Sequence, residues 1–170
     1  MKKQIVCLAS ILVLAFSFSG CGKSSEQKAA EKAVEKAIEQ SSGGQVKVDL
    51  SQDQVKIKDQ KGESVISAKG LAQIPSDFPK DVYVHPNTKV LMVQKMEGGF
   101  HVLLESTENP EPLVNLYKEK MKSDGWQEKA AMAMGQTGIL TYEKESRKAV
   151  VTISQSEKGK TGIQLQVLKN

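Results

Sequence analysis

The residue types that do acid–base chemistry are few in this sequence, and they lie far apart. His85 and His101 are its only histidines, and Asp77 and Asp81 flank a Phe-Pro pair. Two neighbouring carboxylates can act as a general acid and base, but aspartate beside proline more often accepts hydrogen bonds from the amides of a turn. His101 alternates with Phe100 along an expected strand, so its ring is predicted to point away from the core. We therefore predict no catalytic residue and a protein that is not an enzyme.

Metal-binding and cofactor-binding patterns are also missing from the sequence. Met132 and Met134 share one side of an extended segment with Ala130. Thioether sulfur binds copper(I), but we favour core packing, because methionine fills irregular gaps. The histidines and cysteines lack the spacing of a zinc site, and no glycine-rich loop has the pattern that cradles phosphate. The sequence therefore predicts neither a metal nor a cofactor, although residue order alone leaves a Ser-His-Asp arrangement open.

Cys21 is the one residue whose surroundings indicate a chemical modification. An apolar run from Ile5 to Phe18 follows Lys2 and Lys3 and ends in Ser19-Gly20-Cys21. The run is shorter than the roughly 20 residues that a membrane-spanning helix needs. Its basic start and small-residue end are typical of a secretory signal. The arrangement resembles the lipobox of bacterial lipoproteins, although phenylalanine stands where leucine is most frequent.

The lipobox resemblance implies a processed and lipidated chain. Cleavage between Gly20 and Cys21 would remove residues 1–20 as a signal peptide. The Cys21 thiol would then carry a diacylglyceryl group and acyl chains such as palmitate, and each buried methylene contributes about 0.8 kcal/mol to anchoring. Cys7 lies within the signal, so lipidation would account for the single thiol that remains. The alternative is an ordinary secretory signal that is cut nearby.

The expected location is a bacterial cell envelope, with the chain anchored in membrane lipid through Cys21. Gly22, rather than aspartate, follows the cysteine. In Gram-negative lipoproteins this favours the outer membrane, facing the periplasm, over the inner membrane. The formal charge falls from +4 to +2 without Lys2 and Lys3, far from the basic footprint of a nucleic-acid-binding protein. We expect an envelope protein or polymer as partner, and no nucleic acid.

The residues after Cys21 are predicted to form a stalk, a meander and a connector. Residues 24–40 have apolar side chains at helical spacing among lysines and glutamates, which predicts an exposed helix. Ser and Gly residues then break it, so residues 21–44 form a lipidated N-terminus, a helical stalk and a joint. Residues 45–70 alternate apolar and polar side chains and predict a β-meander. Three prolines hold residues 71–88 as an extended connector, from which these side chains enter the core: Phe78, Val82 and Val84.

Residues 89–170 are predicted to form an α+β domain. Strands over 89–96 and 100–107 make a hairpin, and a helix then runs from Pro112 to about Ser123. Gly125 ends the helix, because glycine readily adopts the left-handed conformation. Trp126 opens a strand, where it can fold back on the helix. The order β-β-α-β-β-β is completed by three strands over residues 139–144, 149–154 and 163–168. This describes an antiparallel sheet with one packed helix.

The second face of that sheet is expected to be covered in part. Apolar residues occur on the opposite parity to the main core: Leu91, Val93, Leu103 and Val150. Three short strands alone are marginally stable. We therefore predict that the meander over 45–69, or a partner, lies over this second face.

Three stretches of the sequence are similar to a group of small, largely uncharacterised bacterial lipoproteins. They comprise residues 74–90, 113–126 and 138–154, and they contain the Tyr…Gly-Trp helix end. The resemblance covers residues 45–170 and implies an extended Pro-rich lead, a hairpin and a helix. The group often has glycine in the turn where this chain has His85-Pro86-Asn87. The resemblance to this group implies no catalytic residue.

Together, these patterns predict a lipid-anchored envelope protein whose folded part is a non-enzymatic binding or interaction module. A tether and a stalk are expected, while constellations of acids, bases and metal ligands are missing. The alternative is a carrier of a small ligand or lipid, or an enzyme acting on envelope material, which would need a deep pocket with convergent polar groups. A flat, partly apolar face would favour the binding module. A purely structural role is a third hypothesis.

Overall fold

The computed structural model describes residues 25–51, 53–60, 62–67, 69–70, 72–156 and 159–169. The predicted signal over 1–20, the cleavage position after Gly20 and the lipidation site Cys21 lie outside these residues, so they stay predictions. In the described part of the chain, no helix is long and apolar enough to cross a membrane.

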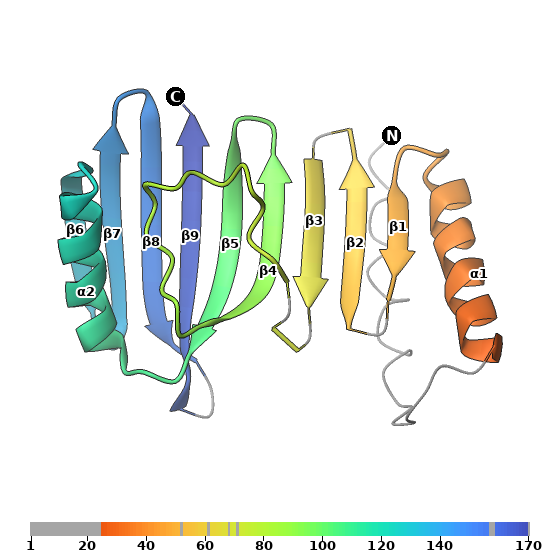
Figure 1. Cartoon of the computed structure of the whole chain (residues 1–170), viewed down its shortest axis with the longest axis horizontal. Helices are drawn as coiled ribbons and strands as arrows, with labels where there is room; N and C mark the ends of the chain where they lie inside the picture. Colours follow the sequence, from red (N-terminus) through yellow and green to blue (C-terminus); the bar gives the residue numbers. More distant parts are fainter. Residues whose placement is uncertain are drawn as a thin grey trace.

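One antiparallel sheet of nine strands makes up most of the described chain (Figure 1). Its order is β1-β2-β3-β4-β5-β9-β8-β7-β6. The strands are β1 (Lys47–Leu50), β2 (Gln54–Asp59), β3 (Gly62–Ser67), β4 (Lys89–Met96), β5 (Gly99–Ser106), β6 (Gln127–Met134), β7 (Thr137–Lys144), β8 (Arg147–Gln155) and β9 (Thr161–Lys169). The helices are α1 (Ser25–Ser41) and α2 (Pro110–Ser123).

The predicted fold class, an α+β sheet of order β-β-α-β-β-β with a separate meander, is wrong. Residues 45–69 do form three strands, but β3 pairs with β4 from Gly62↔Met96 to Ile66↔Met92. These strands therefore extend the sheet sideways instead of covering its second face. Four strands follow α2, one more than the predicted order counts, because the strand expected after Trp126 forms as β6. An alternating pattern defines the two faces of a strand but not its neighbours, which is why the sequence could not place the meander.

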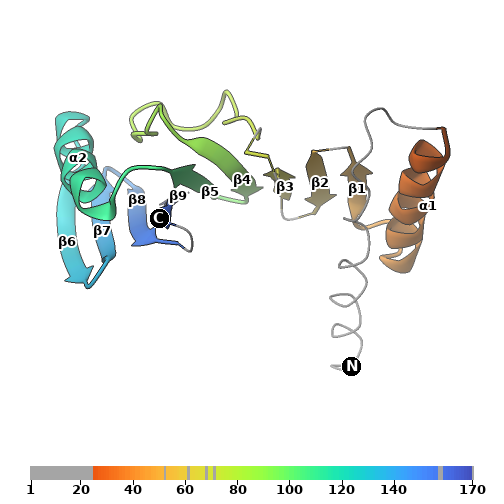
Figure 2. The same ribbon diagram turned by 90° about the horizontal axis from the view of Figure 1, so that it is seen from below.

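The main core lies on one face of the sheet, which we call the covered face. α2 and the connector over residues 72–88 lie on this face, as Figures 1 and 2 show from two directions. Phe78 and Val82 of the connector are buried and Val84 packs against the same core, which confirms the prediction. The sheet and α2 contribute fully buried side chains, among them Val102, Leu104, Leu113, Tyr117, Met121, Ile153 and Ile163. Each large aliphatic side chain buried in this way stabilises the fold by roughly 1.5–3 kcal/mol.

α2 begins two residues before the predicted start and ends as predicted. Pro110 and Pro112 both lie in its first turn, where a missing backbone N–H breaks no helical hydrogen bond. Gly125, with a φ of 84°, follows its end and adopts the left-handed conformation. The helix approaches β7 so closely that a Cβ on Gly138 would lie 2.5 Å from Cγ2 of Val114. Close packing of α2 on the sheet therefore depends on the absence of a side chain there.

α1 is largely exposed, as its thin apolar stripe predicts, yet it also contacts the sheet. Val34 in that stripe is 45% exposed. The helix lies beside β1 (Figure 1), and the Glu35 carboxylate accepts a hydrogen bond from the backbone N–H of Leu50 at 2.6 Å. Because β1 is an edge strand, this contact satisfies a donor that no further strand can pair.

A β-bulge near the start of β4 changes which of its side chains face the core. The register with β5 shifts between Val90 and Met92, so Val93 points to the covered face and is only 2% exposed. The predicted place of Val93 on the second face is therefore wrong, while Leu103 does lie there, opposite Met92. A bulge inserts one residue on one strand only, and strict alternation along the sequence gives no sign of it.

Candidate functional site

The face of the sheet opposite α2 and the connector, which we call the open face, is covered by neither of these two elements (Figure 2). At its β1 end, where α1 packs, Val48 is only 8% exposed. Residues paired across neighbouring antiparallel strands point to the same face, so the register defines what lies there. One row crosses all nine strands, in the order Leu50, Val55, Ile66, Met92, Leu103, Gln164, Thr152, Ile139 and Met132. Strands lie about 4.8 Å apart, so this row is about 38 Å long.

A second row runs beside the first on the same face. It contains Val48, Ile57, Ser64, Gln94, His101, Gln166, Val150, Thr141 and Ala130. Neither row contains Asp, Glu, Lys or Arg, and we call the two rows together the uncharged band. Charged side chains stand beyond it towards the strand ends, where Lys160 pairs with Glu105 at 2.7 Å and Lys148 lies opposite Glu143.

The two rows of the uncharged band offer different contacts to a ligand. The first, which we call the aliphatic row, has apolar side chains over β1 to β5. Its Ile66 and Met132 are 42% and 56% exposed. The middle of the second carries hydroxyl, amide and imidazole groups on Ser64, Gln94, His101 and Gln166. An aliphatic strip beside a strip of hydrogen-bonding groups is suited to an elongated ligand with one apolar and one polar side.

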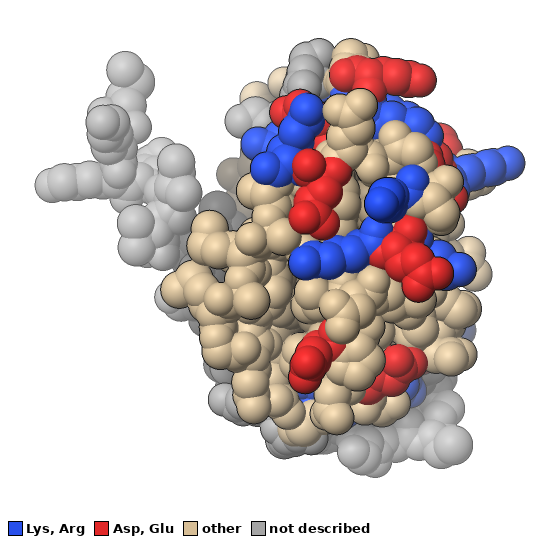
Figure 3. Space-filling model, turned by 90° about the vertical axis from the view of Figure 1, so that its left-hand side faces the viewer, with Lys and Arg blue, Asp and Glu red and all other residues tan. Residues whose placement is uncertain are grey.

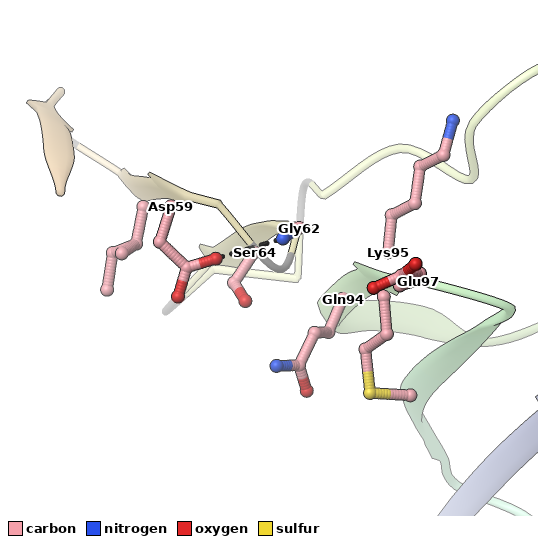
Figure 4. A pocket seen from close by; sticks show the side chains of 8 residues that line it. Asp59, Gly62, Ser64, Gln94, Lys95 and Glu97 are labelled. Carbon is pink, nitrogen blue, oxygen red and sulfur yellow. Dashed lines mark hydrogen bonds between the residues drawn. The ribbon is translucent and has the colours of Figure 1, made fainter. Parts of the chain in front are cut away.

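A hollow of about 390 Å³ adjoins the uncharged band near the β2–β3 and β4–β5 turns (Figure 4). Ile57, Ser64 and Gln94 of the second row line it, and the further lining residues are Asp59, Gly62, Lys95, Met96 and Glu97. The dashed line in Figure 4 marks the Gly62 backbone N–H donating to Asp59 Oδ1 at 2.9 Å. The hollow therefore adds polar side chains to the hydrogen-bonding row.

A second hollow, of about 790 Å³, lies between α2 and the start of β6. Its lining is polar and charged, with Asn115, Lys118, Glu119 and Lys122 from the helix and residues 125–128 from the chain that follows. This lining lacks the aliphatic strip of the uncharged band.

Arg147, the only arginine in the sequence, ties the connector to the β7–β8 hairpin. Its two terminal nitrogens donate to the two carboxylate oxygens of Asp81 at 2.8 and 2.7 Å, and Lys144 Nζ donates to Oδ2 at 2.7 Å. The guanidinium also lies 5.1 Å from the centroid of the Trp126 ring, whose indole N–H donates to the Asp81 carbonyl at 2.6 Å. The Arg147 hydrogen bonds hold the pKa of the Asp81 carboxyl well below its usual value. We call these four residues the Asp81 cluster.

His85 is buried in a hydrogen-bond network and does not face the open side. Its side chain is 7% exposed, with Nδ1 3.0 Å from the Tyr83 hydroxyl and Nε2 2.8 Å from Glu108 Oε1. The Thr161 hydroxyl donates to the Glu108 carbonyl at 2.6 Å. The Nε2 contact with Glu108 therefore holds the connector against the segment before α2, and the Nδ1 contact with Tyr83 lies within the connector. His101 lies on the open face, as predicted.

The two connector carboxylates do not act as a pair. Asp77 forms an exposed ion pair with Lys95, whose hydrogen bond lowers the Asp77 pKa. Asp81 binds Arg147 and Lys144, so its carboxylate serves a long-range ion pair where a turn cap is predicted. In the described part of the chain, no group of three or more His, Cys, Asp and Glu could hold a metal ion.

Met132 and Met134 are not core residues, so the predicted packing of these side chains is wrong. They are 56% and 66% exposed. The reason is the place of β6 at the end of the sheet, where all eight of its residues are exposed. Tyr117 and Trp126, by contrast, are buried as predicted.

Comparison with known proteins adds one match. Residues 89–161 are similar to a family model described as START domain-like. This START-like segment runs from β4 to the first residue of β9 and is less than half of the chain. No curated protein and no solved structure matches. The lipoprotein resemblance is not among these findings and stays a prediction.

The START-like segment contains most of the Asp81 cluster and the β4–β8 part of the uncharged band, neither of which the sequence reasoning found. The band depends on strand order, which alternation does not give. The cluster joins residues more than 60 positions apart. A signal for it was present, because Arg147 is one arginine among 24 basic residues, and a guanidinium is preferred where a carboxylate needs two parallel hydrogen bonds.

Proposed function

We propose that this chain is a non-enzymatic binding module that uses the uncharged band of its open face and is held at a bacterial membrane by lipid on Cys21. The observation that carries the proposal is the band itself, two rows of nine residues without a carboxylate, ammonium or guanidinium group. In a sequence with 26% charged residues, such a surface is unusual, and exposed apolar surface rimmed by polar residues marks interaction sites.

The chemistry of the band defines the ligand class. Its aliphatic row contributes apolar area, and burying that area is favourable by roughly 25 cal/mol per Å². Its Ser64, Gln94 and Gln166 side chains donate and accept hydrogen bonds, which fixes the orientation of a ligand. The preferred partner is therefore an extended envelope protein segment or polymer with one apolar and one polar side.

The second candidate function is a carrier of a small ligand or lipid. The START-like match over residues 89–161 favours it, because a START-like fold is compatible with a ligand-binding or lipid-binding module. In this case the aliphatic row would take up the apolar part of the ligand.

Photo-crosslinking in cells tests where the partner binds. A photoreactive amino acid replaces Ile66 on the open face, and the matched control replaces Glu63, an exposed residue of the same strand on the other face. We expect an adduct from position 66 and none from position 63. A protein or polymer adduct supports the binding module, and a lipid adduct identified by mass supports the carrier. Equal adducts from both positions, or none, contradict the use of the open face.

The proposed anchoring at the membrane is tested separately with the variant Cys21→Ser. We expect the variant to lose labelling by radioactive fatty acid and to leave the membrane fraction, while its fold is unchanged. Unchanged labelling and fractionation would show that the lipid anchor is wrong without affecting the proposal for the open face.

A further inference from the structure

We propose that β6 is a dimerisation edge, through which two copies of this chain join their sheets into one. All eight residues of β6 are exposed, unlike those of any other strand in the described sheet. A long edge strand without proline presents a row of unpaired backbone N–H and C=O groups to another strand. The occupant that this edge fits best is a second copy of itself.

The sequence of β6 is complementary to itself in antiparallel pairing. If the two-fold axis passes at Met132, then Met132 faces Met132 of the second copy, Ala131 faces Ala133, and Ala130 faces Met134. Every one of these pairs is apolar. The charged residues Glu128 and Lys129 fall opposite the turn residues Gln136 and Gly135, so no two charged residues lie opposite each other within the paired strands.

The surface of this edge matches that pairing. Figure 3 looks onto the α2 and β6 end of the molecule, where charged side chains gather over one part and leave a continuous uncharged area beside them. Lys129 already forms an ion pair with Glu143 of β7 at 3.5 Å, so its positive charge is partly compensated within one copy. Met132 and Met134 are the two most exposed large apolar side chains among the described residues.

The two edges of the sheet differ, and this difference limits the assembly to two copies. At the other edge α1 lies beside β1, and Glu35 already accepts the Leu50 N–H. Of the two edges of the described sheet, only β6 is therefore free to add a strand. A contact between identical edges is isologous and closes after two copies, whereas a contact between different edges would propagate into a filament.

Pairing about Met132 also aligns the two open faces. Met132 is the β6 member of the aliphatic row, and Ala130 is the β6 member of the second row. The aliphatic rows of the two copies would meet end to end at the axis and double in length, to about 80 Å over eighteen strands. The dimer itself does not depend on the proposed function, because it rests on the β6 edge alone.

Cysteine crosslinking of the full chain in cell membranes tests both the dimer and its register. In Met132→Cys the two new thiols lie on the axis, with Cβ atoms about 5 Å apart. In the matched control Glu128→Cys, on the same exposed strand, they are eight residues apart, or about 27 Å. A short bismaleimide is expected to crosslink the first variant at least tenfold more than the second. The chain without either substitution shows any product that comes from its own Cys21.

Three results would overturn the proposal: equal crosslinking at positions 128 and 132, no homodimer at either, or an adduct at 132 with a different protein. A second measurement does not depend on cysteine. The molecular mass of the purified full chain is expected to be that of two copies, and Met132→Lys should reduce it to one because two lysines would lie directly opposite each other at the axis. Val34→Lys, at the other end of the sheet, should leave two copies, and thermal unfolding should show that both variants are folded.

Discussion

The covered half of the sheet, β4 to β9 with α2 and the connector, and the outer strands, β1 to β3, are built in the same way but stabilised differently. In the covered half, alternate side chains of the central strands are fully buried. In the outer strands, only Val48 and Ser67 are buried among the described residues, and only Val65 packs against the main core. The outer strands are joined to the covered half chiefly by the backbone pairing of β3 with β4.

The difference shows that alternation and burial are separate properties. Both regions carry apolar residues at every second position of their strands, so both form strands. Whether the apolar side becomes a core depends on what crosses it, and α2 and the connector cross only one part of one face. The surplus apolar side chains of the outer strands thereby become part of an accessible surface.

The largest difference in the free energy of unfolding is expected when an aliphatic side chain is truncated to alanine in each of the two regions. Leu104→Ala removes a fully buried side chain and should lower the free energy of unfolding by about 2–5 kcal/mol. Ile66→Ala, at a site that is 42% exposed, should lower it by less than about 1 kcal/mol. Urea denaturation followed by Trp126 fluorescence and circular dichroism measures both. Equal losses would remove the distinction between the regions.

The second-largest loss of stability is expected when the ion pairs that hold the connector on the covered half are broken. Asp81→Asn breaks the bidentate contact with Arg147 and should cost about 1–3 kcal/mol at pH 7. Asp77→Asn, in the exposed pair with Lys95, is the matched control and should change stability far less. If both variants lose the same stability, the Asp81 cluster is no more important than a surface ion pair.

The Asp81 contribution should also depend on pH, with a sign that follows from its pKa. Because the folded pKa is depressed, the cluster stabilises the protein above the unfolded aspartate pKa of about 3.9. Its contribution is lost as pH falls from that value towards the folded pKa. The stability difference between the original chain and Asp81→Asn should therefore be constant from pH 7 to about 5 and shrink below about 4. A difference that grows on acidification would contradict this assignment.

A third effect, on local opening, compares the two regions without any mutation. Backbone amides of β2 and β3 should exchange hydrogen at least about tenfold faster than those of β8 and β9, because fewer buried contacts must break to expose them. Mass spectrometry of peptides from the two regions measures the ratio. Exchange at one common rate would mean that all nine strands open together.

The smallest effect is expected at the outer edge. Glu35→Ala removes the acceptor for the Leu50 N–H and should destabilise β1 by less than about 1 kcal/mol. Faster exchange at Leu50, with unchanged exchange in β8, is the expected result. Lys36→Ala, next along α1, is the control and should leave the exchange at Leu50 unchanged.

The sequence predicted local features of this protein better than long-range ones. The period-two alternation, the proline-held connector and the glycine after α2 were each sufficient to place an element, because each depends on neighbouring residues. The pairing of β3 with β4 could not be predicted, since alternation fits either face of a sheet or either edge. The exposed methionines of β6 were missed for the same reason, because an apolar strand is a core strand only if another layer covers it.

In the candidate site, too, the sequence predicted local features but not long-range ones. His101 was correctly placed away from the core from its alternation with Phe100, whereas the uncharged band that surrounds it depends on the order of all nine strands. The Asp81 cluster required knowing that the connector crosses to the β7–β8 hairpin. Only the rarity of arginine in this sequence pointed to Arg147.

The position of β9 also bears on how the chain is made. It is the last of the nine strands to be synthesised, yet it lies between β5 and β8 and pairs with both. Before it leaves the ribosome, the strands up to β5 and the strands from β6 to β8 can form only two separate sheets. Translation of the final strand therefore completes the single sheet, and a stop codon just before residue 161 would leave two sheets that share no strand pairing.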